Sequence, residues 1–337
     1  MKVLLSKALM DADRAYVAER LDDGIEIVDP STFDVDGVRA AIAEGGVDVV
    51  MGGLLAEPIL EAAAASGVSF FQIPWTGVDN VDFDALGRHG TTVCNSHSNG
   101  GLVAEHAVAL MLAAAKKIPY HDRLMRGGRW NRVNPAGNEV SPFSRTVAGT
   151  RAVILGYGAI GQGIARRLAG FDVAIDAVTS RGTLAEGAPS VASVRPVAEL
   201  DAALDGADWV FVALPLTDAT RGLVGASALA AMGGASTLVN VSRGAIVDES
   251  ALHAALAGGM ILGAAIDTWY SYPTREEPDR APSSKHDFAA LSNVVMSPHR
   301  AGYATGGFPH LDDAIENLNR AARGEPPINV VASERGY

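Results

Sequence analysis

Short apolar segments alternate with alanine-rich segments along the first hundred residues of this 337-residue chain. The apolar segments are typical of buried strands, and the alanine-rich ones are typical of helices. Strands that alternate with helices pair in parallel, so the pattern predicts an α/β layer sandwich. Strands are expected at residues 3–5, 25–28, 47–50 and 70–73, and helices at residues 38–43 and 57–65.

The clearest predicted helix of the first half covers residues 102–117, because it consists of good helix formers, opens with Glu105 and ends with two lysines. It is apolar nearly all round, which favours an interdomain or intersubunit position. Residues 118–150 lose the pattern and are expected to form an arm or interface loop. The alternation resumes over residues 151–295, and one more helix is expected near residues 311–323, before a tail that returns to the first domain.

Length and composition exclude several classes of protein. At about 150 residues a domain, the length indicates two domains. Lys plus Arg number 27 and Asp plus Glu number 39, giving a formal net charge of −12. Nucleic acids and anionic membranes bind basic patches, so neither is expected as a partner. No apolar run reaches the roughly 20 residues that span a bilayer, and the N-terminus lacks a signal-peptide core, so a cytoplasmic protein is expected.

The single cysteine, Cys94, excludes an intrachain disulfide and a multi-cysteine zinc site. We expect it to be a small buried hydrophobic residue. The histidines show no metal-binding spacing, so no metal is expected.

A glycine-rich turn follows the predicted strand of residues 151–155 and opens a predicted helix at residues 162–168. Gly156 permits a tight turn, Gly158 lets the backbone approach a pyrophosphate, and Gly161 allows close packing of helix and strand. The helix N-terminus adds amide donors and the positive end of its dipole. This context predicts a dinucleotide site at Gly156, Gly158, Ala159, Ile160 and Gly161.

The next predicted strand ends at Thr179, and Ser180 and Arg181 follow. Hydroxyls and a cation there suit the 2′-phosphate of NADP, whereas an NAD site needs a carboxylate. Asp176 lies at the usual motif distance from Gly156, but inside the strand, where it is expected to face a helix layer. We therefore favour NADP(H) and keep NAD(H) as the alternative, in which Arg181 is a solvated loop charge.

Three predicted strands of the second half lead to polar residues. Arg243 follows the strand that begins at Leu238, Asp267 ends the next, and His299 lies just beyond the last. Ligands of doubly wound sheets bind at the carboxyl ends of strands. There the planar guanidinium of Arg243 can hold a carboxylate and polarise the adjacent carbonyl.

The chain resembles the D-isomer-specific 2-hydroxyacid dehydrogenases, the family of phosphoglycerate, glyoxylate/hydroxypyruvate and phosphite dehydrogenases. Seven stretches carry the resemblance in the family's order and span almost the whole chain. They are GVDNVD (77–82), VAEH (103–106), GYGAIG (156–161), LPLTDATRGLVG (214–225), NVSRGAIVDESAL (240–252), GAAIDTW (263–269) and SPHRAG (297–302).

The resemblance implies an α/β protein with two doubly wound parallel sheets and a cleft between its domains. Residues 1–98 and 301–337 would form a flavodoxin-like substrate domain, and residues 99–300 a Rossmann dinucleotide-binding domain. It also implies a homodimer formed through the helix and arm of residues 102–148.

The resemblance also implies roles for single residues. Arg243 would bind the substrate carboxylate and polarise the carbonyl, His299 would donate the proton, and Asp267 would lie near the nicotinamide carboxamide. Further cofactor contacts are expected from Pro215 and Thr220, and further substrate contacts from the backbone of Gly53, Thr76 and Gly77.

One residue departs from the family's pattern. The glutamate that pairs with the catalytic histidine lies five residues after the aspartate, where this chain has Tyr272. A carboxylate keeps the imidazole oriented and protonated for carbonyl reduction, whereas a tyrosine hydroxyl offers no charge. Either Tyr272 orients His299, or the chemistry uses no strong acid/base, as in formate dehydrogenases. Glu276 or Glu277 could replace the missing acid, but the intervening Pro273 argues against this.

These residues favour an oxidoreductase that reduces a small 2-keto acid to the D-2-hydroxy acid. The alternatives are oxidation of a small oxyanion such as formate or phosphite, and a dinucleotide-sensing protein without turnover. Phosphite enzymes of the family carry a lysine where Thr76 stands, and Arg243 and His299 argue against a sensor. Trp269, Tyr270 and Tyr272 are either core aromatics or pocket walls. Candidates for the substrate side-chain pocket are Trp75, Thr76, Tyr270, Tyr272, Arg300 and Tyr303.

Overall fold

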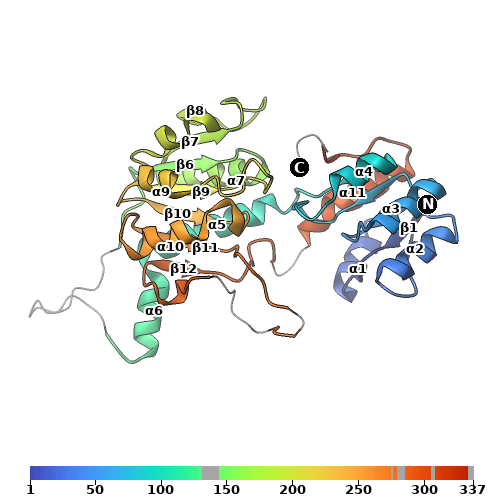
Figure 1. Cartoon of the computed structure of the whole chain (residues 1–337), viewed down its shortest axis with the longest axis horizontal. Coiled ribbons are helices and arrows are strands. Elements are labelled where there is room, and N and C mark those ends of the chain that lie inside the picture. Colours follow the sequence, from blue (N-terminus) through green and yellow to red (C-terminus); the bar gives the residue numbers. More distant parts are fainter. Residues whose placement is uncertain (131–143, 275, 279–284, 305–307, 333–337) are drawn as a thin grey trace, which may run out of the picture. The chain divides into compact units, whose positions relative to one another are not determined.

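The structure is a computed structural model that describes residues 1–130, 144–274, 276–278, 285–304 and 308–332. The chain divides into two compact units, one formed by Met1–Asn99 with Tyr303–Tyr337 and the other by Gly100–Gly302 (Figure 1). Each unit is built around one parallel sheet, which confirms the predicted fold class. The assignment of one unit to the substrate and the other to the cofactor stays a prediction.

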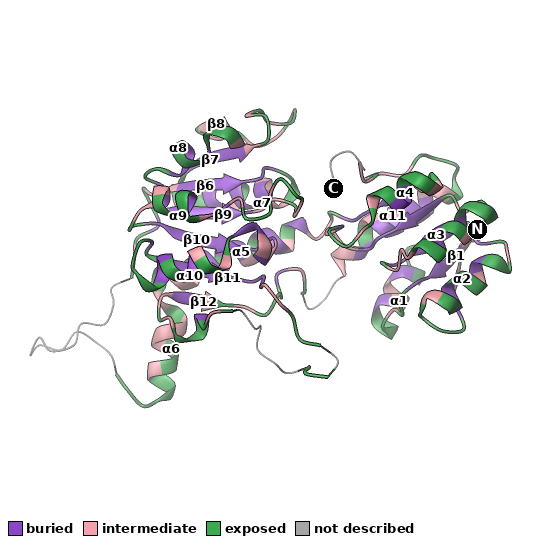
Figure 2. Cartoon of the chain, viewed as in Figure 1, coloured by how far each residue is buried: buried purple, intermediate pink, exposed green. Residues whose placement is uncertain are grey.

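In the described residues, the first unit has a five-stranded sheet in the order β2-β1-β3-β4-β5. Its central strands are buried on both faces, which explains their continuous apolar sequences (Figure 2). The chain changes direction across the sheet between β1 and β3. The strands are β1 (Lys2–Leu5), β2 (Glu26–Val28), β3 (Val49–Met51), β4 (Phe70–Gln72) and β5 (Val93–Cys94).

Helices cover both faces of this first sheet. One apolar cluster joins the sheet to α2 (Val35–Ala43), α3 (Glu57–Ser66) and α4 (Phe83–His89). The other joins it to α1 (Asp11–Ala18) and α11 (Asp312–Ala322), which come from opposite ends of the chain.

The tail after α11 extends the first sheet. Cys94 and Val330 form an antiparallel bridge beside β5. Cys94 is fully buried, as expected, and burial raises the pKa of its thiol to about 12.

The second unit has a seven-stranded parallel sheet in its described residues, in the order β12-β11-β10-β9-β6-β7-β8. The chain starts in the middle at β6, runs outward to β8, and returns to β9 on the other side of β6. The point between β6 and β9 is therefore the topological switch point, where such sheets bind ligands. The strands are β6 (Arg151–Leu155), β7 (Ala174–Thr179), β8 (Ser193–Pro196), β9 (Trp209–Val212), β10 (Thr237–Asn240), β11 (Gly263–Ile266) and β12 (Val294–Met296).

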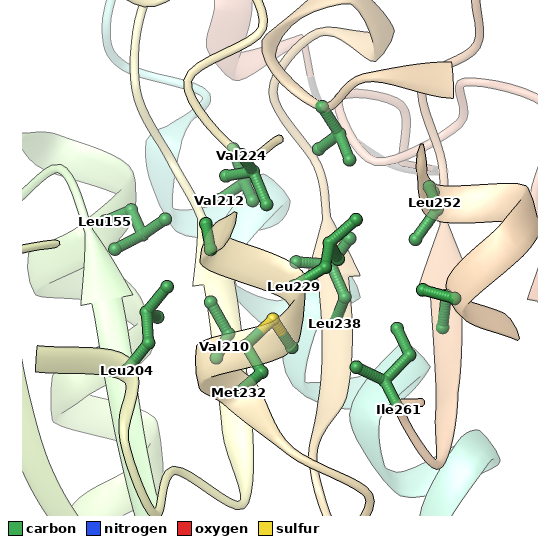
Figure 3. Packing of buried hydrophobic residues seen from close by; sticks show 14 of the residues in the cluster. Leu155, Leu204, Val210, Val212, Val224, Leu229, Met232, Leu238, Leu252 and Ile261 are labelled. Carbon is green, nitrogen blue, oxygen red and sulfur yellow. The ribbon is translucent and has the colours of Figure 1, made fainter. Parts of the chain in front are cut away.

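Two layers of helices bury the faces of this second sheet. On one face lie α5 (Gly100–Lys116) and α7 (Ala159–Leu168). On the other lie α8 (Leu200–Leu204), α9 (Ala226–Met232) and α10 (Glu249–Ala257), whose apolar side chains interdigitate with those of the strands (Figure 3). Single 3₁₀ turns occur at Ala169–Phe171, Val197–Glu199, Gly244–Ile246, Phe288–Ala290 and, in the first unit, Pro309–Leu311.

The prediction of an irregular segment over residues 118–150 is wrong for the first part of that segment, which forms α6 (Ile118–Arg126). Lys117 has φ +54°, so the chain turns there and a new helix begins with a proline in its first turn. Residues 131–143 of the predicted arm lie outside the described residues.

Helix α5 begins at Gly100, two residues before its predicted start, so Glu105 lies beyond the first turn. Its carboxylate lies 3.7 Å from the Arg167 guanidinium on α7. Glu105 therefore forms an ion pair that joins α5 to α7, and it does not lie in the first turn of α5.

Candidate active site

The glycine-rich turn lies at the switch point of the second sheet, between β6 and α7. Gly156 has φ +91°, and a Cβ there would lie 2.5 Å from the carbonyl oxygen of Ala213. A Cβ on Gly161 would lie 2.1 Å from the carbonyl oxygen of Gly156. Both positions therefore require glycine.

Gly158 differs from the other two glycines, because a Cβ on it would meet no atom within 4 Å. It is the N-cap of α7 and no side chain caps the helix there. In the described residues, the first N–H groups of α7, at Ala159, Ile160 and Gly161, have no backbone acceptor, and they follow the uncovered backbone of Gly158. This cradle fits the pyrophosphate of a dinucleotide.

The carboxyl end of β7 carries exposed polar residues. The Thr179 hydroxyl both accepts from the Thr183 N–H and donates to the Thr183 carbonyl, at 3.1 Å each, and so closes a loop. Ser180 and Arg181 are exposed in that loop. The Asp176 carboxylate instead accepts a 2.7 Å hydrogen bond from Arg151 Nε inside the sheet, so it serves as a structural ion pair.

The loop after β9 is held by its own hydroxyls. Thr220 Oγ1 donates to the Pro215 carbonyl at 2.6 Å and accepts from the Thr217 N–H at 2.8 Å. The Ser242 hydroxyl donates to the Leu214 carbonyl and ties this loop to the end of β10. Thr220 therefore shapes the loop that carries Pro215 along the switch-point edge.

Arg243 follows β10, and the backbone on both of its sides is fixed. Asn240 Oδ1 accepts from the Ser242 N–H, and Asn240 Nδ2 donates to the Arg243 carbonyl, both at 3.0 Å. A Cβ on Gly244 would lie 2.4 Å from the Trp269 carbonyl oxygen, so only glycine fits after Arg243. The half-buried Arg243 side chain donates from Nη1 to the Ser242 carbonyl at 2.9 Å.

Asp267 follows β11 and is fully buried. Its carboxylate accepts from Ser297 Oγ at 2.5 Å and from the N–H groups of Arg300 at 2.9 Å and Ala301 at 3.0 Å. Burial opposes the charge, but hydrogen bonds from His106, Ser297 and the two amides lower the pKa of Asp267 to about 2. The ionised carboxylate therefore fixes the segment that carries His299.

The sequence analysis assigned no role to two residues of this cluster, His106 and Ser297. His106 Nε2, on α5, lies 3.0 Å from Ser297 Oγ and 3.5 Å from the Asp267 carboxylate. The available signal was the VAEH stretch, which belongs to the resemblance although it lies at no strand end.

His299 lies just beyond β12 with φ +55°, in the left-handed region. Its N–H donates to the Asp267 carbonyl at 2.8 Å. The Tyr272 ring lies beside the imidazole, with centroids 5.3 Å apart and planes 41° apart. The Tyr272 hydroxyl oxygen accepts from the Trp269 N–H at 3.3 Å. The tyrosine thus contacts His299 through its ring.

Other residues around this tyrosine have different surroundings. A hydrogen bond from Thr274 lowers the pKa of the exposed Glu276 carboxyl. Trp269 is buried and donates from Nε1 to the Ser297 carbonyl at 2.8 Å, and Tyr270 stacks on Phe288. Trp269 is therefore a core aromatic and the partly buried Tyr270 packs against the same core, whereas Tyr272 is 45% exposed.

Two loops of the first unit carry the remaining predicted contacts. In the described part of the chain, the N–H groups of Gly53, Thr76 and Gly77 have no protein acceptor. The Thr76 carbonyl accepts from Asn95 Nδ2 at 2.7 Å, and the Thr76 hydroxyl donates to Asn99 Oδ1 at 3.0 Å. Side-chain hydrogen bonds therefore hold the loop that contains Thr76, while the N–H groups of Thr76 and Gly77 remain available to bind an anion.

Comparison with known proteins decides the family. Residues 108–301 match the model of the D-isomer specific 2-hydroxyacid dehydrogenase, NAD binding domain. Glyoxylate reductase from Pyrococcus furiosus is 32% identical over 261 residues, covering 77% of this chain and 74% of that protein. The chain belongs to the D-isomer-specific 2-hydroxyacid dehydrogenase family, as its motifs predicted.

Other members of this family match nearly the whole chain. D-3-phosphoglycerate dehydrogenase from Mycobacterium tuberculosis (strain ATCC 25618 / H37Rv) is 34% identical over 317 residues, covering 90% of this chain. The chain spans about half (54%) of that relative's length. The solved NADPH-dependent glyoxylate/hydroxypyruvate reductase of Sinorhizobium meliloti, in complex with citrate, has a TM-score of 0.77 at 28% identity and covers 98% of both chains.

The matched domain contains the glycine turn, Arg243, Asp267 and His299. Together with the open cradle at Gly158, it confirms the predicted nicotinamide dinucleotide binding. Within the described residues, no helix is both long and apolar enough to cross a membrane, and no cluster of three His, Cys, Asp or Glu side chains could hold a metal ion. A cytoplasmic location stays a prediction.

Proposed function

We propose that the chain reduces a small 2-keto acid to the D-2-hydroxy acid with a reduced nicotinamide dinucleotide. One observation carries the proposal. Arg243, Asp267 and His299 follow the adjacent strands β10, β11 and β12 of the sheet whose switch point holds the glycine turn. Backbone hydrogen bonds join their segments, from the Asp267 N–H to the Asn240 carbonyl at 2.9 Å and from the His299 N–H to the Asp267 carbonyl at 2.8 Å.

The reaction needs a polarised carbonyl and a proton for the oxygen. Arg243 would bind the keto acid with its planar guanidinium and draw electron density from the carbonyl. When bound, the reduced nicotinamide supplies a hydride to the carbonyl carbon. His299, as the imidazolium, would give its proton to the developing alkoxide oxygen and become neutral. Asp267 would keep the His299 segment in place.

Turnover assays test this function. Glyoxylate, hydroxypyruvate and pyruvate are offered with NADH and with NADPH, and loss of the reduced-nicotinamide absorbance is followed. Turnover with at least one keto acid is expected. Cofactor binding without turnover on any of them would contradict the proposal and favour a dinucleotide sensor.

The Tyr272→Glu variant tests the pairing with His299. A carboxylate beside the imidazolium favours its charged form, whereas oxidation of the hydroxy acid needs the neutral imidazole as base. The lower limb of the pH profile for oxidation is therefore expected to move to higher pH, by about one unit. Tyr272→Phe keeps the ring contact and is the matched control, with an unmoved profile. An unmoved limb in the glutamate variant would argue against any pairing of position 272 with His299.

We further propose that NADP(H) is the preferred cofactor. The hydroxyls and guanidinium at Thr179, Ser180 and Arg181 support this, as does the exposure of Ser180 and Arg181 at the carboxyl end of β7. Two family members favour it as well: the S. meliloti reductase is named NADPH-dependent, and a D-isomer specific 2-hydroxyacid dehydrogenase of Xanthobacter autotrophicus Py2, with a TM-score of 0.78 at 25% identity, was solved with NADPH.

Replacement of Arg181 by alanine is expected to raise the KM for NADPH about tenfold, because a charged donor to the 2′-phosphate is lost. The KM for NADH, which lacks that phosphate, should change less than about twofold and serves as the internal control. Steady-state kinetics with both cofactors measures the change. An equal rise in the KM for NADPH and in the KM for NADH would show that Arg181 does not recognise the 2′-phosphate.

We also propose that the chain forms a homodimer through α5, α6 and the segment that follows. Helix α6 has no buried residue, and its neighbourhood exposes large apolar side chains. Ile118 is 58% exposed, Met125 53% and Trp130 76%, which marks an unusual apolar surface for a monomer. Sedimentation analysis should return the mass of a dimer, and a monomer at micromolar concentration would contradict this proposal.

A further inference from the structure

The sheet of the first unit has a switch point of its own, between β1 and β3. Ser6 and Lys7 follow β1, and Gly52 and Gly53 follow β3. In open parallel sheets, ligands bind outside the carboxyl ends of the strands at this point. Side chains at this edge are therefore the first candidates for contacts with a ligand of the first unit.

Lys7 has an ordered position at this edge. Its ammonium Nζ lies 5.0 Å from the centroid of the Trp75 ring, in a cation–π contact. The ring in turn lies against the loop after β3, since a Cβ on Gly53 would come within 2.4 Å of Trp75 Cζ2. A Cβ on Gly52 would lie 2.3 Å from Ser6 Oγ. Both glycines are thus needed for this close packing.

The ammonium keeps its capacity to bind an anion. Among the residues that the structure describes, the cation–π contact is the one interaction found for the Lys7 side chain, with no ion pair to a carboxylate and no hydrogen bond to an oxygen. The aromatic face attracts the charge but takes none of its three N–H donors in a conventional hydrogen bond. Lys7 is exposed, so these donors can be reached from solvent.

Open backbone donors lie beside the same ring. Thr76 and Gly77 directly follow Trp75, and their N–H groups, like that of Gly53, have no acceptor in the described part of the chain. Trp75 therefore contacts a positive side chain and directly precedes two of the three open amides, while its ring packs against the third residue, Gly53. Such a surface can hold two anionic groups of one small molecule, one on the amides and one on the ammonium.

We propose that Lys7 is a specificity-determining residue that binds a second anionic group, a carboxylate or phosphate, on the side chain of the 2-keto acid. The inference rests on the proposed function and on the expectation that the amides of Gly53, Thr76 and Gly77 also contact the first carboxylate. The chain then prefers keto acids with two anionic groups to those with one.

The test uses three keto acids that share a three-carbon core. Pyruvate carries one anionic group, oxaloacetate adds a carboxylate, and 3-phosphohydroxypyruvate adds a phosphate. Lys7→Met removes the charge and keeps an unbranched apolar side chain over Trp75. It should raise the KM of the preferred dianionic substrate at least about tenfold and that of pyruvate less than about twofold. Lys7→Arg keeps the charge and should retain most of the preference.

The comparison of the two dianionic substrates identifies the group. If Lys7→Met raises only the KM for oxaloacetate, Lys7 binds a second carboxylate. If it raises only the KM for 3-phosphohydroxypyruvate, Lys7 binds a phosphate. Equal changes for pyruvate and both dianions would overturn the proposal, because Lys7 would then act on structure or on the shared carboxylate.

A binding measurement separates this proposal from the proposed reduction. Calorimetric titration of the full chain without cofactor uses D-lactate, D-malate and D-3-phosphoglycerate, so no turnover is needed. Tighter binding of a dianion that disappears in Lys7→Met supports the role of Lys7 even if no keto acid is reduced. The proposal is overturned if the original protein and Lys7→Met bind the dianions with the same affinity, or if neither dianion binds.

Discussion

Replacing Arg243 by alanine is expected to lower kcat/KM for keto-acid reduction about 10³-fold, the largest effect predicted for a single position of this chain. The guanidinium would bind the substrate carboxylate and stabilise the charge that develops on the carbonyl oxygen, so its loss removes two interactions at once. The backbone around Arg243 is fixed by Asn240 and by the contact of Gly244 with Trp269. The variant should therefore keep its fold.

Steady-state kinetics and the midpoint of thermal unfolding check this result together. Arg243→Lys retains a positive charge but loses the planar pair of donors, and should still lose about 10²-fold. Arg195→Ala, which removes a half-buried arginine on the edge strand β8 that pairs with Glu199 at 3.1 Å, is the matched control and should leave kcat/KM unchanged. An Arg243→Ala variant with kcat/KM close to the original would refute the assigned role.

The His299→Asn variant is expected to lower kcat about 10²- to 10³-fold, because no group then donates the proton to the alkoxide. Asparagine is the suitable replacement here. His299 has φ +55°, a conformation that asparagine adopts more readily than most residues do. The pH dependence of kcat that reports on the imidazole should disappear with it. Rates of reduction over a range of pH measure both effects.

His299→Ala separates the loss of the proton donor from backbone strain. Alanine lacks the polar side chain that eases the left-handed conformation, so this variant should also be less stable by about 1 kcal/mol. Thermal unfolding would then distinguish the two variants, while their kcat values stay similar. Full activity of His299→Asn would show that no proton is transferred by His299, and would favour the oxidation of a small oxyanion such as formate.

The sequence predicted those features that depend on local constraints. The glycine turn is one, since the roles of Gly156, Gly158 and Gly161 follow from the geometry of a single strand–turn–helix unit. The alternation of strands and helices is another, and it led directly to two parallel sheets.

Features that depend on contacts distant in sequence were missed. The His106–Ser297 hydrogen bond joins residues 191 positions apart, and no local pattern predicts it. Helix α6 was missed for another reason. The left-handed Lys117 makes a helix possible where proline and mixed polarity indicated a loop.

One face of the sheet of the first unit is fully covered only after α11 has been synthesised, although all five strands lie within residues 2–94. The apolar side of β1, β3 and β4 packs against α1 and against α11, whose Leu311, Ala314 and Leu318 come from the last tenth of the sequence. Gly100–Gly302, in contrast, is continuous and leaves the ribosome complete. The second unit can therefore fold before the first, against the usual order of translation. Until then, the nascent chain carries an apolar sheet face that α1 covers only in part, which is a surface that a chaperone could bind.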